Sequence, residues 1–200
     1  MRAIALTVAC IGFLTSAVVV TGQQGRSESS VTPQSESPQY AKGSNLVRPP
    51  DYREWVYLSS GLGMEYMPDT NRESPRFGNV FVNPSSYRAF MKTGKWPDKT
   101  TFVLEFRAST SEGSINKGGR FQSQLVGLEA EVKDSRFPDG WAFFNFGRGA
   151  AIGNVAEPLP VDAGCVECHT KNTAVERTFV QFYPTLLDVA RRMKTLKPGF

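Results

Sequence analysis

The stretch CVECH, Cys165 to His169, sets a chemical requirement that the fold of this chain has to meet. Two cysteines separated by two residues and followed at once by a histidine form the pattern of covalent c-type haem attachment. On one turn of helix, both thiols can form thioethers to one edge of a porphyrin, and His169 then projects toward the iron as its proximal ligand. The sequence therefore predicts one haem c, held by Cys165, Cys168 and His169.

Three other uses of this motif compete with haem attachment. A structural zinc site needs four ligands, but the chain has one histidine and three cysteines, of which Cys10 lies in the N-terminal apolar run. A disulfide between Cys165 and Cys168 stays open outside the cytoplasm, although it gives the adjacent His169 no role. A thioredoxin-like pair is expected in a βαβ unit, opening a helix after a strand, whereas this motif follows a long loop.

The single histidine also limits the sixth position of the iron. A methionine there would give a six-coordinate electron-transfer haem, and the chain beyond its N-terminal run offers Met64, Met67, Met91 and Met193. If none of them reaches the iron, the metal is five-coordinate. A small molecule can then bind, and the polarity of the distal pocket decides whether it is only bound or also transformed.

The N-terminal region has the features of an export signal. Arg2 precedes an apolar run that closes on small residues, which predicts a signal peptide over residues 1–22. An uncleaved anchor is the alternative, because the run approaches membrane-spanning length. Residues 23–46 are rich in Gln, Ser, Pro and Gly and predict a flexible linker. One folded domain over residues 47–200 follows. It is expected in the periplasm or otherwise exported, or tethered to a membrane by the uncleaved segment.

The charge pattern argues against nucleic acid as a partner. The formal net charge is only +4, and lysines and arginines are scattered among acidic residues. A nucleic-acid-binding surface would need a basic stripe, and the sequence shows none.

The segments around the motif predict strands first and helices last. Residues 78–83, 100–109, 120–134 and 141–146 have strand-like patterns, and residues 84–93 have the Pro start and Gly stop of a helix. Residues 147–164 read as loop, and residues 163–172 and 176–196 look helical. This order predicts an α+β fold, an antiparallel sheet packed with a few helices, with the haem near the C-terminal helical segment.

A late haem motif in a strand-rich chain is unlike a small all-helical cytochrome c. The runs YREWV, NVFVNPSSY, KTGKWPDKT, VGLEAEVKDSRF, GWAFFNF, CVECH and FVQFYPTL, from Tyr52 to Leu186, resemble the cytochrome P-460 family and its relative cytochrome c′-β. The resemblance implies a dimeric monohaem protein with a large antiparallel sheet on one side of the haem. It also implies that sheet residues form the distal pocket.

One residue separates the activities of this family. Cytochrome P-460 proper has a lysine bonded to the haem periphery and oxidises hydroxylamine. The register on Asp98, Thr100 and Glu105 puts Leu104 at the position of that lysine. Leucine cannot form the bond, so the resemblance is closer to cytochrome c′-β, which has an apolar, aromatic distal pocket and binds nitric oxide and carbon monoxide.

Several residues are candidates for the site that the resemblance implies. The distal-pocket candidates are Phe81, Phe102, Leu104, Phe106 and Phe143, and Phe144 and Phe146 lie on the same predicted strands. Any strand phenylalanine can instead be simply core. Glu105 and Glu129 interrupt apolar strands and are candidates for a proton shuttle, with a solvent-facing position as the alternative. Arg76, Arg107 and Arg120 are all candidates for pairing with the haem propionates, and the sequence does not choose among them.

These observations leave three functional hypotheses. The first is a five-coordinate haem protein that binds nitric oxide or a related small nitrogen oxide. The second is an enzyme that oxidises hydroxylamine or converts a nitrogen oxide or peroxide. The third is an electron-transfer cytochrome with a methionine ligand. The expected partners are the small gaseous ligand, a redox partner cytochrome and a second copy of the chain.

Overall fold

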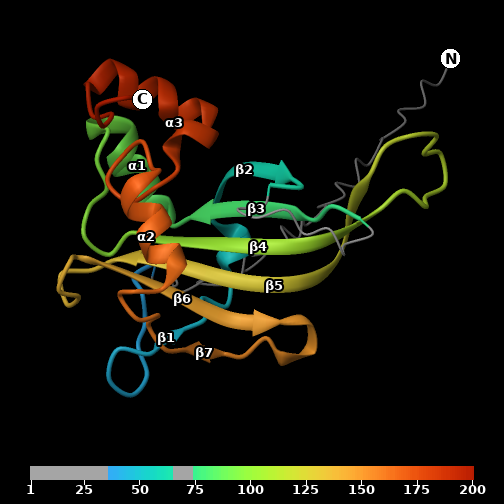
Figure 1. The fold of residues 1–200 in the computed structure, drawn as a ribbon, viewed down its shortest axis with the longest axis horizontal. Coiled ribbons are helices and arrows are strands. Elements are labelled where there is room, and N and C mark those ends of the chain that lie inside the picture. Colours follow the sequence, from blue (N-terminus) through green and yellow to red (C-terminus); the bar gives the residue numbers. More distant parts are fainter. Residues whose placement is uncertain (1–35, 65–73) are drawn as a thin grey trace, which may run out of the picture. The chain divides into compact units, whose positions relative to one another are not determined.

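The computed structural model describes residues 36–64 and 74–200. Within them, five strands form an antiparallel sheet in the order β2-β3-β4-β5-β6 (Figure 1). The strands are β2 Val56–Leu62, β3 Phe77–Val82, β4 Thr101–Thr110, β5 Phe121–Lys133 and β6 Trp141–Arg148. The helices are α1 Pro84–Thr93, α2 Gly164–Lys171 and α3 Pro184–Met193, and the short 3-10 turns are η1 Tyr52–Glu54, η2 Gly149–Ala151 and η3 Val180–Phe182. The predicted α+β class is confirmed.

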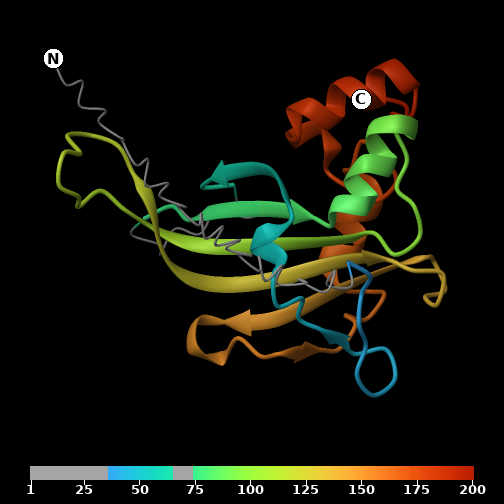
Figure 2. The same ribbon diagram turned by 180° about the vertical axis from the view of Figure 1, so that it is seen from behind.

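The sheet has two faces, because side chains alternate along each strand. One face, here called the α2 face, packs Phe102 and Trp141 into an apolar cluster with residues around α3. The other, here called the N-terminal face, packs Val103 and Phe144 into a second cluster. Figure 1 shows α2 in front of the sheet, whereas Figure 2, from behind, shows η1 and the short strand β1 in front.

Helix α1 and the segment after α2 are joined through Trp96, by a ring contact on one side and a hydrogen bond on the other. Helix α1 begins at Pro84 and ends at Gly94, whose φ of 68° lies in the left-handed region that favours glycine. Trp96 then packs on Phe90, with ring centroids 4.1 Å apart. The Trp96 indole N–H donates to Thr178 Oγ1 at 2.9 Å. This contact holds the chain that follows α2 against the sheet.

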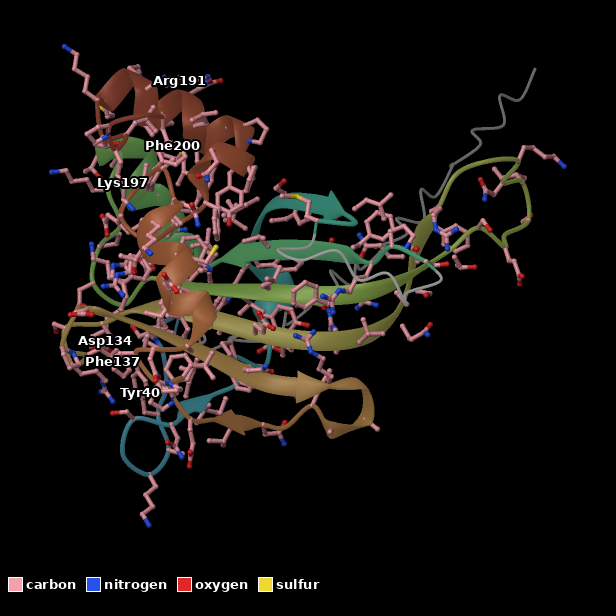
Figure 3. The ribbon with its side chains drawn as sticks, viewed as in Figure 1. Tyr40, Asp134, Phe137, Arg191, Lys197 and Phe200 are labelled. Atoms are coloured by element: carbon pink, nitrogen blue, oxygen red, sulfur yellow. The ribbon has the colours of Figure 1, made fainter. Side chains whose placement is uncertain are left out.

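The folded domain begins earlier than the sequence predicts. Leu46 is fully buried, and β1 (Leu46–Val47) pairs with β7 (Val155–Ala156). The Tyr40 hydroxyl donates to Asp134 Oδ2 at 2.8 Å, and Figure 3 shows Tyr40, Asp134 and Phe137 together near one end of the sheet. The prediction that the linker runs to residue 46 is therefore wrong, because Tyr40 and Leu46 are apolar enough to be buried against the domain.

Two other predictions concern the N-terminal segment and the loop that precedes α2. The predicted signal peptide and residues 23–35 of the linker lie outside the described residues. The predicted loop over residues 147–164 contains η2 and β7. In the part of the chain that the structure describes, no helix has the length and apolar character needed to cross a membrane.

Candidate haem-attachment site

Helix α2 presents the predicted attachment motif. It begins after Ala163, whose carbonyl accepts the backbone N–H of Val166 at 2.9 Å. Residues spaced by three and four positions share one face of a helix, so Cys165, Cys168 and His169 lie on the same side of α2. Both cysteines are free thiols and half-buried, and burial raises the pKa of Cys165. This is the arrangement that attachment to one edge of a porphyrin requires.

The hydrogen bond made by His169 Nδ1 leaves the other ring nitrogen, Nε2, with a free lone pair. Its Nδ1 lies 2.8 Å from the carbonyl oxygen of Arg177. A carbonyl oxygen can only accept, so Nδ1 carries the hydrogen and Nε2 is the acceptor nitrogen. The ring packs against Phe143 and Phe179, with centroids 4.6 Å away in each case. Metal-bound histidines donate their second ring N–H in this way, so His169 fits iron ligation through Nε2.

A buried carboxylate lies beside the histidine. Glu131 Oε2 is 3.4 Å from His169 Nδ1, and Glu131 Oε1 is buried with no hydrogen-bond partner among residues 36–64 and 74–200. Burial raises the pKa of Glu131. Burial alone lowers the pKa of His169, but the charge and hydrogen bond of Glu131 raise it overall. Sequence reasoning missed Glu131, although its place two residues after Glu129 on one strand was a usable signal.

Four of the five predicted distal-pocket residues lie on the α2 face. Phe143 contacts the His169 ring, and Phe102 belongs to the apolar cluster against which Cys168 packs. Leu104 and Phe106 follow Phe102 at two-residue intervals on β4, so they share its face. Both are half-buried. Their role toward a bound ligand stays a prediction.

Glu129 also lies on the α2 face, opposite Leu104 in the pairing of β4 with β5. Its Oε1 accepts a hydrogen bond from Arg148 Nη2 at 2.9 Å. Burial raises the pKa of Glu129, and the nearby Arg148 and Arg76 offset part of that rise. The Glu129 charge acts on the pKa values of both Cys165 and His169. The candidate proton shuttle is therefore close enough to the attachment motif to influence it electrostatically.

The structure corrects two of the site predictions. Phe81 lies on the N-terminal face, where its ring centroid is 5.7 Å from that of Tyr52. Glu105 lies on the same face and accepts hydrogen bonds from Tyr52 Oη at 2.5 Å and Arg53 Nε at 2.8 Å. The predictions of Phe81 in the distal pocket and of Glu105 as a proton shuttle are wrong, because strand alternation turns both side chains away from α2.

Glu105 is instead part of a buried ion-pair network. Arg107 Nε donates to its Oε1 at 2.5 Å. Burial raises the pKa of Glu105, but the hydrogen bonds from Arg107, Tyr52 and Arg53 outweigh it and hold the pKa below its usual range. A carboxyl group that stays ionised and fully hydrogen-bonded is a structural group rather than a proton carrier.

The three arginines that the sequence offers as propionate partners also lie in different parts of the sheet. Arg107 is on the N-terminal face with Glu105, and Arg120 bonds Ser109 near the hairpin that joins β4 to β5. The Arg76 guanidinium carbon lies 4.3 Å from the ring centroid of Phe106, on the α2 face. Arg148 lies on this face as well and was not among the sequence candidates.

The candidate methionine ligands are spread over the domain. Met64 is 53% exposed and Met193 is 39% exposed. Met91 packs against the α2-face cluster, and Met67 lies outside the described residues.

A helix that carries two thiols and one oriented histidine against an antiparallel sheet fits the class of haem cytochromes. In the described residues, no three His, Cys, Asp or Glu side chains are grouped to hold a bare metal ion. The family model for Cytochrome P460 matches residues 49–180. The chain therefore belongs to the cytochrome P460 family, and its predicted resemblance is confirmed. No curated protein matches the chain.

Proposed function

We propose that this chain is an exported c-type monohaem cytochrome whose five-coordinate iron binds nitric oxide or a related small nitrogen oxide. Cys165 and Cys168 would hold the haem by two thioethers, each thiol giving its sulfur to a C–S bond and its hydrogen to a C–H bond at a vinyl group. His169 would bind the iron through Nε2. The bound haem supplies an open coordination position for a small ligand.

Leu104 is the observation that carries this proposal. It lies on the α2 face between Phe102 and Phe106, at the position where the resemblance places the haem-bonding lysine of the hydroxylamine-oxidising relative. Leucine has no nucleophilic atom and cannot form that bond. Lys133 shares the face, but its Nζ bonds Glu176 Oε2 at 2.6 Å and the Trp96 carbonyl at 2.7 Å. The apolar row of Phe102, Leu104 and Phe106 along β4 supports binding of a neutral diatomic gas.

The test is an absorption spectrum of the reduced holoprotein before and after nitric oxide is added. The expected result is an ordinary high-spin c-type spectrum that shifts on addition. A strongly red-shifted Soret band would contradict the proposal, because it indicates a haem cross-linked to a side chain. The double variant Cys165→Ala with Cys168→Ala is the control for attachment, and it should lose the haem on a denaturing gel.

Oxidation of hydroxylamine, or conversion of a nitrogen oxide or peroxide, is the second candidate, and Glu129 favours it. This carboxyl group is opposite Leu104 and its pKa is raised by burial, which suits a group that takes up and releases a proton during a reaction. Steady-state assay with hydroxylamine and an electron acceptor tests this candidate. Turnover of hydroxylamine by the unaltered protein, lost in Glu129→Gln, would show that the protein is an enzyme.

Export and assembly are part of the same proposal. The N-terminal apolar run supports a periplasmic or membrane-tethered location. The edge strand β2 leaves Tyr57 53% and Leu62 48% exposed, which supports a homodimer. Fractionation of cells and sedimentation of the holoprotein test these two points, and a cytoplasmic monomer would contradict both.

A further inference from the structure

Two guanidinium groups flank one aromatic ring on the α2 face. The guanidinium carbon of Arg76 is 4.3 Å from the Phe106 ring centroid, and that of Arg148 is 5.4 Å from it. Arg76 precedes β3 and Arg148 ends β6, so the two cations come from strands on either side of β4, which carries Phe106. Stacking on an aromatic ring fixes the plane of a guanidinium and orients its N–H groups.

A β-bulge in β6 puts Arg148 on this face. Leu128 pairs with Gly147 but Glu129 pairs with Asn145, so one extra residue interrupts the alternation. Without the bulge, Arg148 would point to the N-terminal face. Gly147 has φ of 109°, and a Cβ there would lie 2.5 Å from the Ala151 carbonyl oxygen. Bulges commonly re-aim a side chain next to a functional site.

Glycines make room for this arrangement. Phe106 pairs with Gly78 on β3 and with Gly127 on β5. A Cβ on Gly127 would lie 2.9 Å from Arg148 Nη1 and 3.3 Å from the Phe106 ring. The position of the Arg148 guanidinium therefore depends on the absence of a side chain at residue 127. Glu129 holds the same guanidinium at 2.9 Å through Nη2, and a guanidinium has five N–H groups in all.

The distance from the attachment motif suits the far edge of a porphyrin. His169 contacts Glu131, and Gly127 is four residues away on the same strand, a separation of about 13 Å at roughly 3.3 Å per residue. Thioethers hold one edge of the ring, and the propionates extend from the edge opposite. We propose that Arg76 and Arg148 bind the propionate carboxylates of the haem attached at Cys165 and Cys168. This inference rests on the covalent attachment proposed above.

The variants that test it are Arg76→Gln and Arg148→Gln, with Arg148→Lys to keep the charge without the two-pronged geometry. Arg120→Gln is the matched control, because Arg120 bonds Ser109 near the hairpin. Two properties of each covalent holoprotein are measured. They are the propionate bending modes in the resonance Raman spectrum and the reduction potential at one pH.

The expected result is a shift of the propionate modes in both glutamine variants, with an unchanged spectrum in Arg120→Gln. The potential should fall in both, because a positive charge near the ring favours the reduced iron. Arg148→Lys should shift the modes but lower the potential less. Unmoved propionate modes in both glutamine variants would overturn the inference. Failure of the unaltered chain to bind haem covalently would overturn the proposed function together with it.

Discussion

The carboxyl groups on the two faces of the sheet have pKa values shifted in opposite directions. On the N-terminal face, Glu105 accepts hydrogen bonds from Tyr52, Arg53 and Arg107, and its pKa is lowered. On the α2 face, Glu129 and Glu131 have raised pKa values. On the N-terminal face the hydrogen bonds compensate the burial of the carboxylate. The α2 face keeps under-satisfied carboxyl groups beside the haem motif, as is typical of functional sites.

The largest expected effect comes from breaking the N-terminal face at Glu105. Glu105→Ala leaves Tyr52, Arg53 and Arg107 without their shared acceptor, and we expect a loss of about 3–5 kcal/mol of unfolding free energy. Glu129→Ala is the matched variant on the α2 face. It removes a half-exposed pair with Arg148 and should cost about 1 kcal/mol or less. Urea unfolding of both holoproteins measures the difference, and equal losses would contradict the distinction between the faces.

The second-largest expected effect comes from disturbing the bulge in β6. Gly147→Ala puts a Cβ against the Ala151 carbonyl, in a backbone conformation that alanine avoids. We expect a cost of roughly 1–3 kcal/mol together with changed propionate modes, since Arg148 loses its direction. Gly140→Ala is the control, because Gly140 also has positive φ but a Cβ there meets nothing within 4 Å. Unfolding and resonance Raman spectra of the two variants separate strain from misplacement of Arg148.

The neighbours Phe143 and Phe144 sharpen the comparison, because they point to opposite faces. Phe144 is 1% exposed in the N-terminal cluster, and Phe143 contacts the His169 ring. Each Phe→Leu variant should lose about 1–2 kcal/mol of unfolding free energy. Only Phe143→Leu should alter the haem spectrum and nitric oxide affinity. A spectral change in Phe144→Leu alone would reverse the assignment of the faces.

The smallest expected effect is on the pH dependence of stability. The pKa of Glu105 is lowered in the folded protein, so its contribution is present above its usual pKa and is lost as the pH falls through the folded value. Glu105→Gln should therefore weaken the fall in stability on the acid side. The pKa of Glu129 is raised, so its contribution is present at low pH and lost as the pH rises. Glu129→Gln should remove that loss, as measured by urea midpoints on the acid and the alkaline side of the ordinary glutamate pKa.

Prediction from the sequence succeeded where local spacing decides the outcome. The helix that starts at Pro84 and stops before Gly94, the strand-like pattern of residues 100–109, and the shared helical turn of Cys165, Cys168 and His169 all follow from short-range geometry. It failed where the choice was between two faces of a strand. Phe81 and Glu105 lie on predicted strands like Phe102 and Glu129, but strand pairing and alternation put both on the N-terminal face, where each contacts Tyr52 of η1.

The sequence by itself determined the α+β class, the family resemblance and the attachment motif, because composition, periodicity and a five-residue pattern carry them. The tertiary structure alone decided the hydrogen bond from His169 to Arg177, the approach of Glu131, and the meeting of Arg76 with Arg148 over Phe106. The contacts of Glu131 and of the two arginines join segments that are distant in the chain or depend on one extra residue in β6, so they arise only when strands pair in a particular register. The contact of His169 with Arg177 spans eight residues and depends on how the chain after α2 folds back, which no helix or strand periodicity encodes.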